Sequence, residues 1–440
     1  MLLTSYPFLF FFFPISLIFF FLIFEKEKRL KILFLGFISA YFYYLDNGKL
    51  IVILLFLAIF TKVQIQKKYF SNFIYVFITL LPLIVFKYSY IFYEFFDIST
   101  PHFIETNFPI GLSFFTFQTI AYYFDKRRLE NNDSTFEIFT FLSFFPQLLA
   151  GPIVDISTFR LGVNHTATRK EINLGVERLS VGLLKKFFLA DTLSEITSLY
   201  INSNEVYNFT FLSSFILIFS YTFQIYFDFS GYCDIAIGLG LFFGFKLPEN
   251  FDRPYISKSF KEFWQRWHIT LSTFFKNHVY IPLGGNRVSK HVTYRNLWVT
   301  FFCTALWHGS SLTFLFWGFL HGLFLTIEKV IKFNKFMSNR FTTFILISLS
   351  WVPFFAKSLS DVFNIYQGIL TFDIQRDYLL PLIFQNIDFR FMIVAIFCIL
   401  SLKTKKIELK QTSLTTYPLL LIAIIVILSS SVDPFIYFRF

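Results

Sequence analysis

One histidine, His308, interrupts a long apolar run, and it is the first position at which this chain could do chemistry. The run covers residues 301–329, and Gly309, Ser310 and Ser311 follow the histidine directly. An ionisable side chain at membrane depth is costly, so it is a functional candidate by default, and an imidazole exchanges protons near neutral pH. The small residues leave room for a substrate, whereas a structural histidine would bond a backbone carbonyl. From the residues alone, both interpretations stay open.

A second histidine, His268, lies in a basic cassette, residues 246–291, that differs from the rest of the chain. Apolar residues recur there at helical spacing, which predicts an amphipathic helix, and Ser259 followed by Glu262 predicts a capping box at its start. His268 falls about 80° from the centre of the apolar stripe, so a structural hydrogen bond at the cytoplasmic membrane interface would also explain it. The stripe is formed by Phe260, Phe263, Trp264, Trp267, Leu271, Phe274 and Phe275.

Other polar residues carry weaker signals. The turn that ends at Arg287 has two glycines and a guanidinium that suit a phosphate, although a simple turn is the favoured interpretation. Asp228 lies one helical turn after Gln224 in an apolar segment, and pairing with an arginine of the cassette is favoured over catalysis. His321 and Glu328 are two helical turns apart, too far for direct contact. We expect no metal site, because no histidine pair has i, i+4 spacing.

The elements that must position these residues are membrane-spanning helices. Hydrophobic residues make up 55% of the 440 residues and charged residues only 15%, which excludes a disordered chain and makes a soluble domain untenable. We expect an all-α polytopic membrane protein with about ten to twelve crossings, arranged as one membrane-embedded domain over residues 1–440. The apolar stretches lie near residues 5–24, 30–45, 50–61, 69–86, 109–124, 134–153, 209–229, 295–307, 310–331, 341–357, 379–400 and 415–432, and two interrupted ones, expected to be re-entrant or interfacial, at 178–201 and 231–245.

The charge of the short loops predicts the orientation. Basic residues cluster at 26–31, 62–68 and 126–128, whereas the loops between them, at 46–49 and 87–108, are poor in basic residues. Positively charged loops stay in the cytoplasm, so we expect the N-terminus outside and the first apolar stretch retained as a span. We attribute the net charge of +11 to orientation and to contact with the lipid bilayer, not to nucleic acid, for which the chain has no motif.

A set of sequence strings occurs one after another between residues 109 and 440. The strings are PIGLSFFTFQTIAYYFD, FFPQLLAGPI, FQIYFDFSGYCDIAIGLGLFFGFKLPENF, NFDRPYISKSFKEFWQRWHITLS, VYIPLGGNR, ALWHGSSLTFLFWGFLHGL and FIYFRF. Their ordered combination resembles the membrane-bound O-acyltransferase superfamily, and within it the bacterial branch that contains alginate and peptidoglycan O-acetyltransferases. Each string alone is moderately specific, and the combination is highly specific.

The resemblance implies a ring of transmembrane helices with a thinned centre, in which an acyl group moves from a thioester to a hydroxyl. It implies that His308, in the WHG string, is the catalytic residue, and that His268, in the WHI string, is the second histidine. As a general base, a neutral His308 would take the proton of a sugar hydroxyl that attacks the thioester carbonyl. Candidate substrate- or donor-binding residues are Trp267, Trp307, Asp228, Gln224, Asn250 and Arg287.

The same resemblance implies the partners. We expect cytosolic acetyl-CoA as the acyl donor, no bound cofactor, an exported cell-envelope polysaccharide as the acceptor, and the bacterial cytoplasmic membrane as the location. A separate periplasmic acetyltransferase partner is typical of related systems, although no feature of this chain demands one. The acceptor itself is not fixed by the sequence.

Two alternatives stay open. D-alanyl transfer to a teichoic-acid-type polymer uses similar WHI and WHG histidines, although IPLGGNR, residues 281–287, favours the acetyl-transferring branch. A polysaccharide transporter or export scaffold fits the many spans, and thioester cleavage by the purified protein would discriminate. The chain departs from the branch at residues 276–278, where Lys-Asn-His replaces the usual Arg-Asp-Tyr, so no role is carried over for that carboxylate.

Overall fold

The computed structural model describes residues 2–24, 27–96, 108–126, 133–203, 208–330, 339–373, 377–403, 413–430 and 435. These residues form helices and connecting turns, with no strand among them, so the all-α prediction is confirmed. Contacts divide the chain into two compact units. Residue 26 of the first basic loop, residues 127–128 of the third, residues 97–107 of the acidic loop and all but the first residue of FIYFRF lie outside the described residues.

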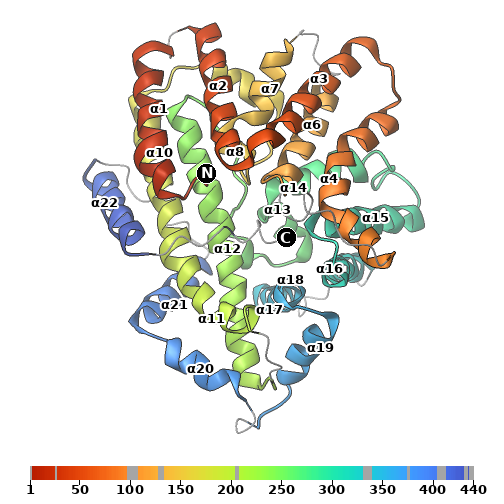
Figure 1. Cartoon of the computed structure of the whole chain (residues 1–440). Helices are drawn as coiled ribbons and strands as arrows, with labels where there is room; N and C mark the ends of the chain where they lie inside the picture. The colour runs from red at the N-terminus through yellow and green to blue at the C-terminus, as the bar shows by residue number, and fades with distance from the viewer. Residues whose placement is uncertain are drawn as a thin grey trace. The chain divides into compact units, whose positions relative to one another are not determined.

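Unit 1 comprises Met1–Leu183, Tyr232–Glu249 and Gln411–Ile425. In it, α2 (Lys28–Asn47) and α3 (Ile51–Lys67) both pack against α7 (Thr135–Ser143), which lies between them at the red-to-yellow end of the colour scale (Figure 1). The other helices of this part of the chain are η1 (Phe8–Phe12), α1 (Phe13–Phe19), η2 (Phe20–Phe24), η3 (Gly48–Leu50), α4 (Asn72–Phe95), α6 (Leu112–Lys126), α8 (Phe145–Leu148), α9 (Ile156–Val163) and α10 (Arg169–Leu184).

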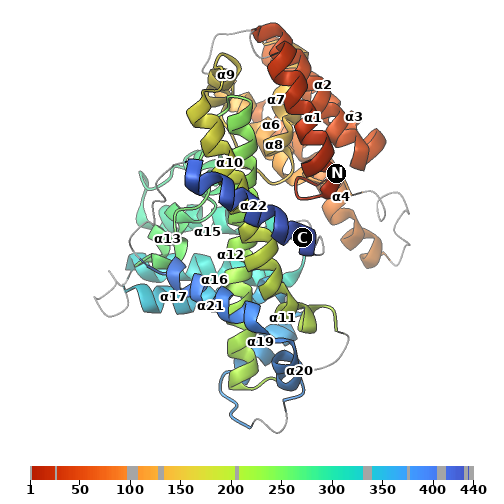
Figure 2. The same ribbon diagram turned by 90° about the vertical axis from the view of Figure 1, so that its left-hand side faces the viewer.

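Unit 2 comprises Leu184–Gly231, Asn250–Lys410 and Val426–Phe440. Here α15 (Lys290–His308) packs along α16 (Leu312–Val330), and α11 (Asp191–Ile201) contacts both α20 (Leu379–Asn386) and α21 (Phe389–Ser401) (Figure 2). The remaining helices of this unit are η4 (Lys185–Ala190), η5 (Pro254–Ile256), α13 (Phe260–Arg266), α14 (Ile269–Phe275), η6 (Lys276–Tyr280), α17 (Arg340–Ser350), α18 (Val352–Phe355) and α19 (Leu359–Gly368). Two helices are divided between the units: α12 (Phe211–Phe242) belongs to unit 1 from Tyr232 onward, and α22 (Ser413–Ser429) belongs to unit 1 up to Ile425.

Fewer helices could cross a bilayer by themselves than the hydropathy of the sequence predicts. Among the described residues, the segments Lys28–Lys67, Asn72–Ser89 and Phe211–Phe242 are long and apolar enough, and α20 with α21, bent by 94°, adds a broken fourth. Three shorter apolar helices lie at Phe8–Ile23, Arg340–Phe355 and Thr416–Ser429. Many expected spans are therefore short or broken helices.

Helix α12 corrects the prediction for residues 231–245. The expected re-entrant or interfacial segment is instead the continuation of a 32-residue helix that ends at Phe242. Glycines in this stretch do not break the helix, because they permit close packing: a Cβ on Gly238 would lie 2.8 Å from the carbonyl oxygen of Gly175 on α10. Small residues at such crossings let two backbones approach each other in membrane proteins.

The cassette at 246–291 also differs from its prediction. The expected continuous amphipathic helix is broken at His268 into α13 and α14. At its start, Ser259 accepts a hydrogen bond from the Glu262 N–H at 3.1 Å, as predicted, but the Glu262 carboxylate bonds Lys258 N instead of closing a reciprocal box. Most of the apolar stripe is buried within the protein instead of facing a membrane interface: Phe260, Phe263, Trp267, Leu271, Phe274 and Phe275 are at most 6% exposed.

Candidate active site

His268 lies at the break between α13 and α14, in the left-handed backbone conformation with φ 43° and ψ 54°. Its side chain is buried inside the protein, whereas the helical spacing predicted a position beside the apolar stripe at a membrane interface. The break is made by Asn250, whose carbonyl oxygen accepts from Ile269 N at 3.0 Å and whose side chain accepts from Thr270 N at 3.1 Å. A distant residue therefore supplies the acceptors that start α14, and this overrides the local helical pattern.

The Asn250 side chain also fixes the tautomer of His268. Its Oδ1 lies 3.2 Å from Nδ1 of His268, and it accepts from the backbone N–H of Thr270, so this atom is the amide oxygen and acts only as an acceptor. Nδ1 must then carry the proton, and Nε2 carries the lone pair. Burial lowers the pKa of His268 to about 3, which keeps the ring neutral near pH 7. The imidazole is thus held as a base whose accepting atom is Nε2.

His308 is the last residue of α15 and is buried among aromatic rings. Its ring centroid lies 4.8 Å from those of Trp307 and Trp317 and 5.0 Å from that of Phe354. The small residue after it does not leave an open space, because a Cβ on Gly309 would lie 2.1 Å from the ring of Phe314. The room that the sequence suggested for a substrate is filled here by an aromatic side chain.

Trp307 connects the two predicted histidines. Its ring lies 5.9 Å from that of His268 and 4.8 Å from that of His308. Trp267 joins the same cluster through Trp351, 4.7 Å away. The structure therefore brings together five of the residues singled out from the sequence: His268, His308, Trp267, Trp307 and Asn250.

A third histidine, His321, belongs to this cluster and had no assigned role. Its ring lies 4.7 Å from that of Trp317, which also contacts His308. Ser350 Oγ donates its one proton to the Ile347 carbonyl at 2.7 Å, so the 3.1 Å contact between Ser350 Oγ and His321 Nε2 has the imidazole as donor. The signal that marked His308, an ionisable residue in an apolar run, applies equally to His321 and could have found it.

Asp228 and Gln224 are buried on α12, but their partners differ from the prediction. Asp228 forms an ion pair with Lys186 at 3.1 Å, not with an arginine of the cassette. Lys186 also bonds Asp191 at 2.7 Å, and Gln224 accepts from the Thr197 hydroxyl at 2.6 Å. The π-helix η4 carries Lys186, and a cation in the irregular segment 178–201 was not expected to face α12.

Arg287 is exposed in the turn before α15, and no contact joins it to either histidine in the described part of the chain. The turn's own backbone uses the donors that a phosphate would need, since the N–H groups of Gly284, Gly285 and Arg287 bond carbonyls within the turn. The structure thus agrees with the simple-turn interpretation. No group of three His, Cys, Asp or Glu residues that could hold a metal ion occurs among the described residues.

The region that contains this cluster of histidines and tryptophans is similar in sequence to known proteins. The sequence pattern of the family described as "MBOAT, membrane-bound O-acyltransferase family" matches residues 124–355. A protein of Pseudomonas aeruginosa named "Probable alginate O-acetylase AlgI" is 40% identical over 272 residues, 60% of this chain and 52% of that protein. The "Peptidoglycan O-acetyltransferase" of Helicobacter pylori is 39% identical over 300 residues, 60% of this chain and 56% of that protein.

A more distant relative is the "Teichoic acid D-alanyltransferase" of Bacillus subtilis, 27% identical over 260 residues, 55% of this chain and 65% of that protein. The chain spans about half the length of the O-acetyltransferase relatives it matches. The family pattern extends over more than half of the 440 residues and includes both predicted histidines and every aromatic neighbour named above. The chain is therefore a multi-pass membrane protein that belongs to the membrane-bound O-acyltransferase family.

Proposed function

We propose that this chain is an O-acetyltransferase that moves an acetyl group from a cytosolic thioester to hydroxyls of an exported cell-envelope polysaccharide. The observation that carries the proposal is the pair of buried histidines, His268 and His308, that both contact the ring of Trp307 within the family region. The O-acetyltransferase relatives near 40% identity favour acetyl over D-alanyl transfer, since the D-alanyltransferase relative is only 27% identical. Acetyl-CoA is the proposed donor.

In the proposed reaction, neutral His308 accepts the proton of a sugar hydroxyl while that oxygen attacks the thioester carbonyl. Collapse of the tetrahedral intermediate expels the thiolate, which takes the proton back from the imidazolium. His268, held neutral with its lone pair on Nε2, contacts the same Trp307 ring and serves the donor's acyl end. Because His308 is buried, the proposal requires the ring of Phe314 to move when substrate binds.

The proposed location is the bacterial cytoplasmic membrane, with the N-terminus outside and the donor arriving from the cytosol. A periplasmic acetyltransferase would be the natural partner if the acetyl group is relayed before it reaches the polysaccharide. A direct transfer and a relay differ in whether the purified chain alone acetylates a soluble glycan.

The test is His308→Ala, with His291→Ala as the control because His291 is exposed in the first turn of the same helix. We expect His308→Ala to lower acetyl transfer about 10²- to 10⁴-fold, the usual contribution of a general base, and His291→Ala to leave it unchanged. Mass analysis of cell-surface glycans and thiol release from acetyl-CoA by purified protein give the two readouts. Full acetylation by a normally inserted His308→Ala protein would refute the proposal, and ligand passage without thioester cleavage would favour a transporter.

A further inference from the structure

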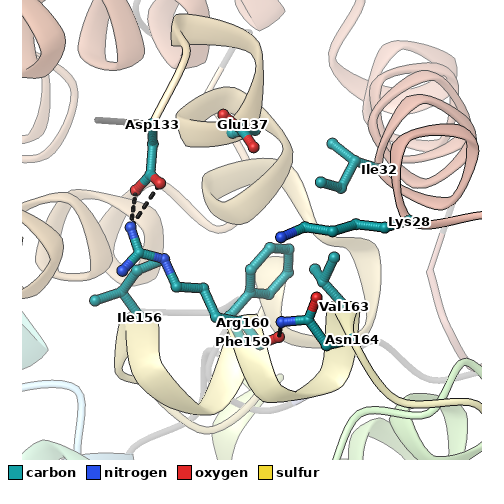
Figure 3. A pocket seen from close by; sticks show the side chains of 9 residues that line it. All are labelled: Lys28, Ile32, Asp133, Glu137, Ile156, Phe159, Arg160, Val163 and Asn164. Atoms are coloured by element: carbon teal, nitrogen blue, oxygen red, sulfur yellow. Dashed lines mark hydrogen bonds and ion pairs between the residues drawn. The ribbon is translucent and has the colours of Figure 1, made fainter. Parts of the chain in front are cut away.

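A polar cavity of about 350 Å³ lies in unit 1, and no residue of the histidine cluster lines it. It is lined by α2, α7 and α9, and its charged residues are Lys28, Arg160, Asp133 and Glu137. Figure 3 shows the Lys28 side chain extending from α2 across the cavity, while the Arg160 guanidinium lies at the opposite wall beside Asp133. None of these residues enters the proposed acyl transfer.

The two carboxylates of the cavity are already engaged. Asp133 accepts from Tyr122 Oη at 2.6 Å, from Lys126 Nζ at 2.9 Å and from Nη2 of Arg160 at 2.5 and 2.7 Å. Glu137 caps its own helix, where its carboxylate accepts from Ser134 N at 2.7 Å. Asp133 is thus paired with two cations, Lys126 and Arg160, whereas Glu137 uses one oxygen for the cap.

The donors of the cavity are in surplus. Lys28 makes no hydrogen bond or ion pair with any other described residue. Arg160 uses only Nη2 toward Asp133, and no acceptor for its Nη1 or Nε lies among the described residues. Lys28 is also the first residue of α2, a helix of 20 residues whose N-terminus has no side-chain cap, so the helix dipole adds positive potential there. The cavity therefore suits an anion.

The surroundings of the cavity are those of a lipid-facing surface. Lys28 begins the longest of the segments that could cross a membrane, Lys28–Lys67. An exposed apolar residue lies close in the chain to each of the two cations: Leu30, two residues after Lys28, is 37% exposed, and Leu161, directly after Arg160, is 72% exposed. Headgroups lie at the ends of spanning helices, and basic pockets between such helices bind anionic lipid headgroups.

We propose that this cavity binds the phosphate group of an anionic phospholipid, with Lys28 and Arg160 as its charged donors and the acyl chains running along the exposed apolar residues beside them. Binding forms no covalent bond and does not depend on acyl transfer. The same phosphate chemistry occurs in soluble phosphate esters, so the experiment must separate the two sources.

The experiment measures lipid retention by the purified full-length protein in detergent, by native mass spectrometry. The probes are phosphatidylglycerol, phosphatidylcholine and, as the soluble source, glycerol phosphate. The variants are Lys28→Ala and, as the matched control, Arg29→Ala, which removes a neighbouring exposed cation that does not line the cavity. Equal melting temperatures of the two variants and the parent protein establish that all three are folded.

We expect retention of phosphatidylglycerol over phosphatidylcholine, a loss of about tenfold in phosphatidylglycerol affinity for Lys28→Ala, and less than about twofold for Arg29→Ala, as for loss of one charge-assisted contact. Glycerol phosphate at the same concentration should not displace the lipid. Equal losses in both variants, or equal retention of the two lipids, would overturn the proposal. Displacement by glycerol phosphate would also overturn it, by assigning the site to a soluble ester.

Discussion

At the scale of single residues, the side-chain amide of Asn250 determines which nitrogen of His268 can accept a proton. Asn250 accepts from Nδ1 of His268 and from Thr270 N at the same oxygen, so the imidazole is held in one tautomer. The ring is buried, and burial keeps its pKa near 3. A polar residue 18 positions away in the chain therefore sets the protonation of the histidine.

Replacing Asn250 should change the reaction through this histidine. Asn250→Leu removes the acceptor, and we expect kcat for thioester cleavage to fall about tenfold or more because the tautomer is no longer fixed. Asn250→Asp keeps an acceptor but adds a negative charge, which raises the pKa of His268 because it stabilises the imidazolium. The rate of thioester cleavage by the Asn250→Asp variant should then be kept at high pH and lost as the pH falls through the raised pKa of His268. A pH profile of Asn250→Asp identical to the parent profile would contradict this.

The buried ion pair of Lys186 with Asp228 and Asp191 supports a prediction about stability. Lys186→Met leaves the buried carboxylate of Asp228 and the part-buried carboxylate of Asp191 without this cation, and removing one partner of a buried pair costs about 3–5 kcal/mol. We expect a clear fall in the melting temperature in detergent, partly recovered by the double variant Lys186→Met with Asp228→Asn. Lys185→Met, on the same π-helix but less buried, is the control and should shift the midpoint less. No recovery in the double variant would argue against direct coupling of the pair.

At the scale of helices, the contact between α10 and α12 depends on two glycines. A Cβ on Gly238 would meet Gly175 O and Leu179 N, both at 2.8 Å, and backbone atoms cannot turn aside as a side chain can. A Cβ on Gly175 would meet its nearest atom, Gly238 O, at 3.1 Å. A Cβ therefore has less room at Gly238 than at Gly175, although both glycines lie at the same helix crossing.

We expect Gly238→Ala to destabilise the protein by about 1–3 kcal/mol, the usual range for overpacking, and Gly175→Ala to cost less. Thermal unfolding of the two variants in the same detergent provides the measurement. A Gly175→Ala protein less stable than the Gly238→Ala protein would contradict this account.

The sequence predicts helices well and their surroundings less well. The stretch 109–124 was expected to span the membrane, yet α6 is only 15 residues long and nearly all of its side chains are buried in the protein. Hydropathy cannot distinguish a helix that faces lipid from one that faces other helices, because both are apolar. The break at His268 was not predictable either, since its cause is a hydrogen-bonded contact with Asn250, far along the chain.

For the candidate site too, the sequence predicts some features and not others. The WHI and WHG strings identified His268 and His308, and the structure places both against Trp307. The partner of Asp228 was predicted wrongly, because Lys186 comes from an apolar stretch whose fold the local pattern did not reveal. Arg287 was named from its turn alone, and its side chain is exposed. Motif spacing finds the residues, whereas three-dimensional packing decides their partners.

At the scale of the whole molecule, the proposed orientation in the membrane can be tested directly. Lys49 and Lys68 lie at opposite ends of α3 and are both exposed, in loops predicted to lie outside and inside respectively. In a protein without its natural cysteines, we expect the thiol introduced by Lys49→Cys to react with an impermeant maleimide in intact cells. Lys68→Cys should react only after the membrane is opened. The reverse pattern would invert the topology and place the donor side of the proposed reaction outside the cell.

The left-handed backbone at His268 means that glycine would fit this position with less strain. A non-glycine residue in that conformation costs about 1–2 kcal/mol. A library selected only for heat resistance should therefore drift toward glycine at residue 268, whereas a library selected for growth that depends on the modified envelope should keep the imidazole. The two selections, run in parallel, would separate what folding prefers at this residue from what the cell requires of it.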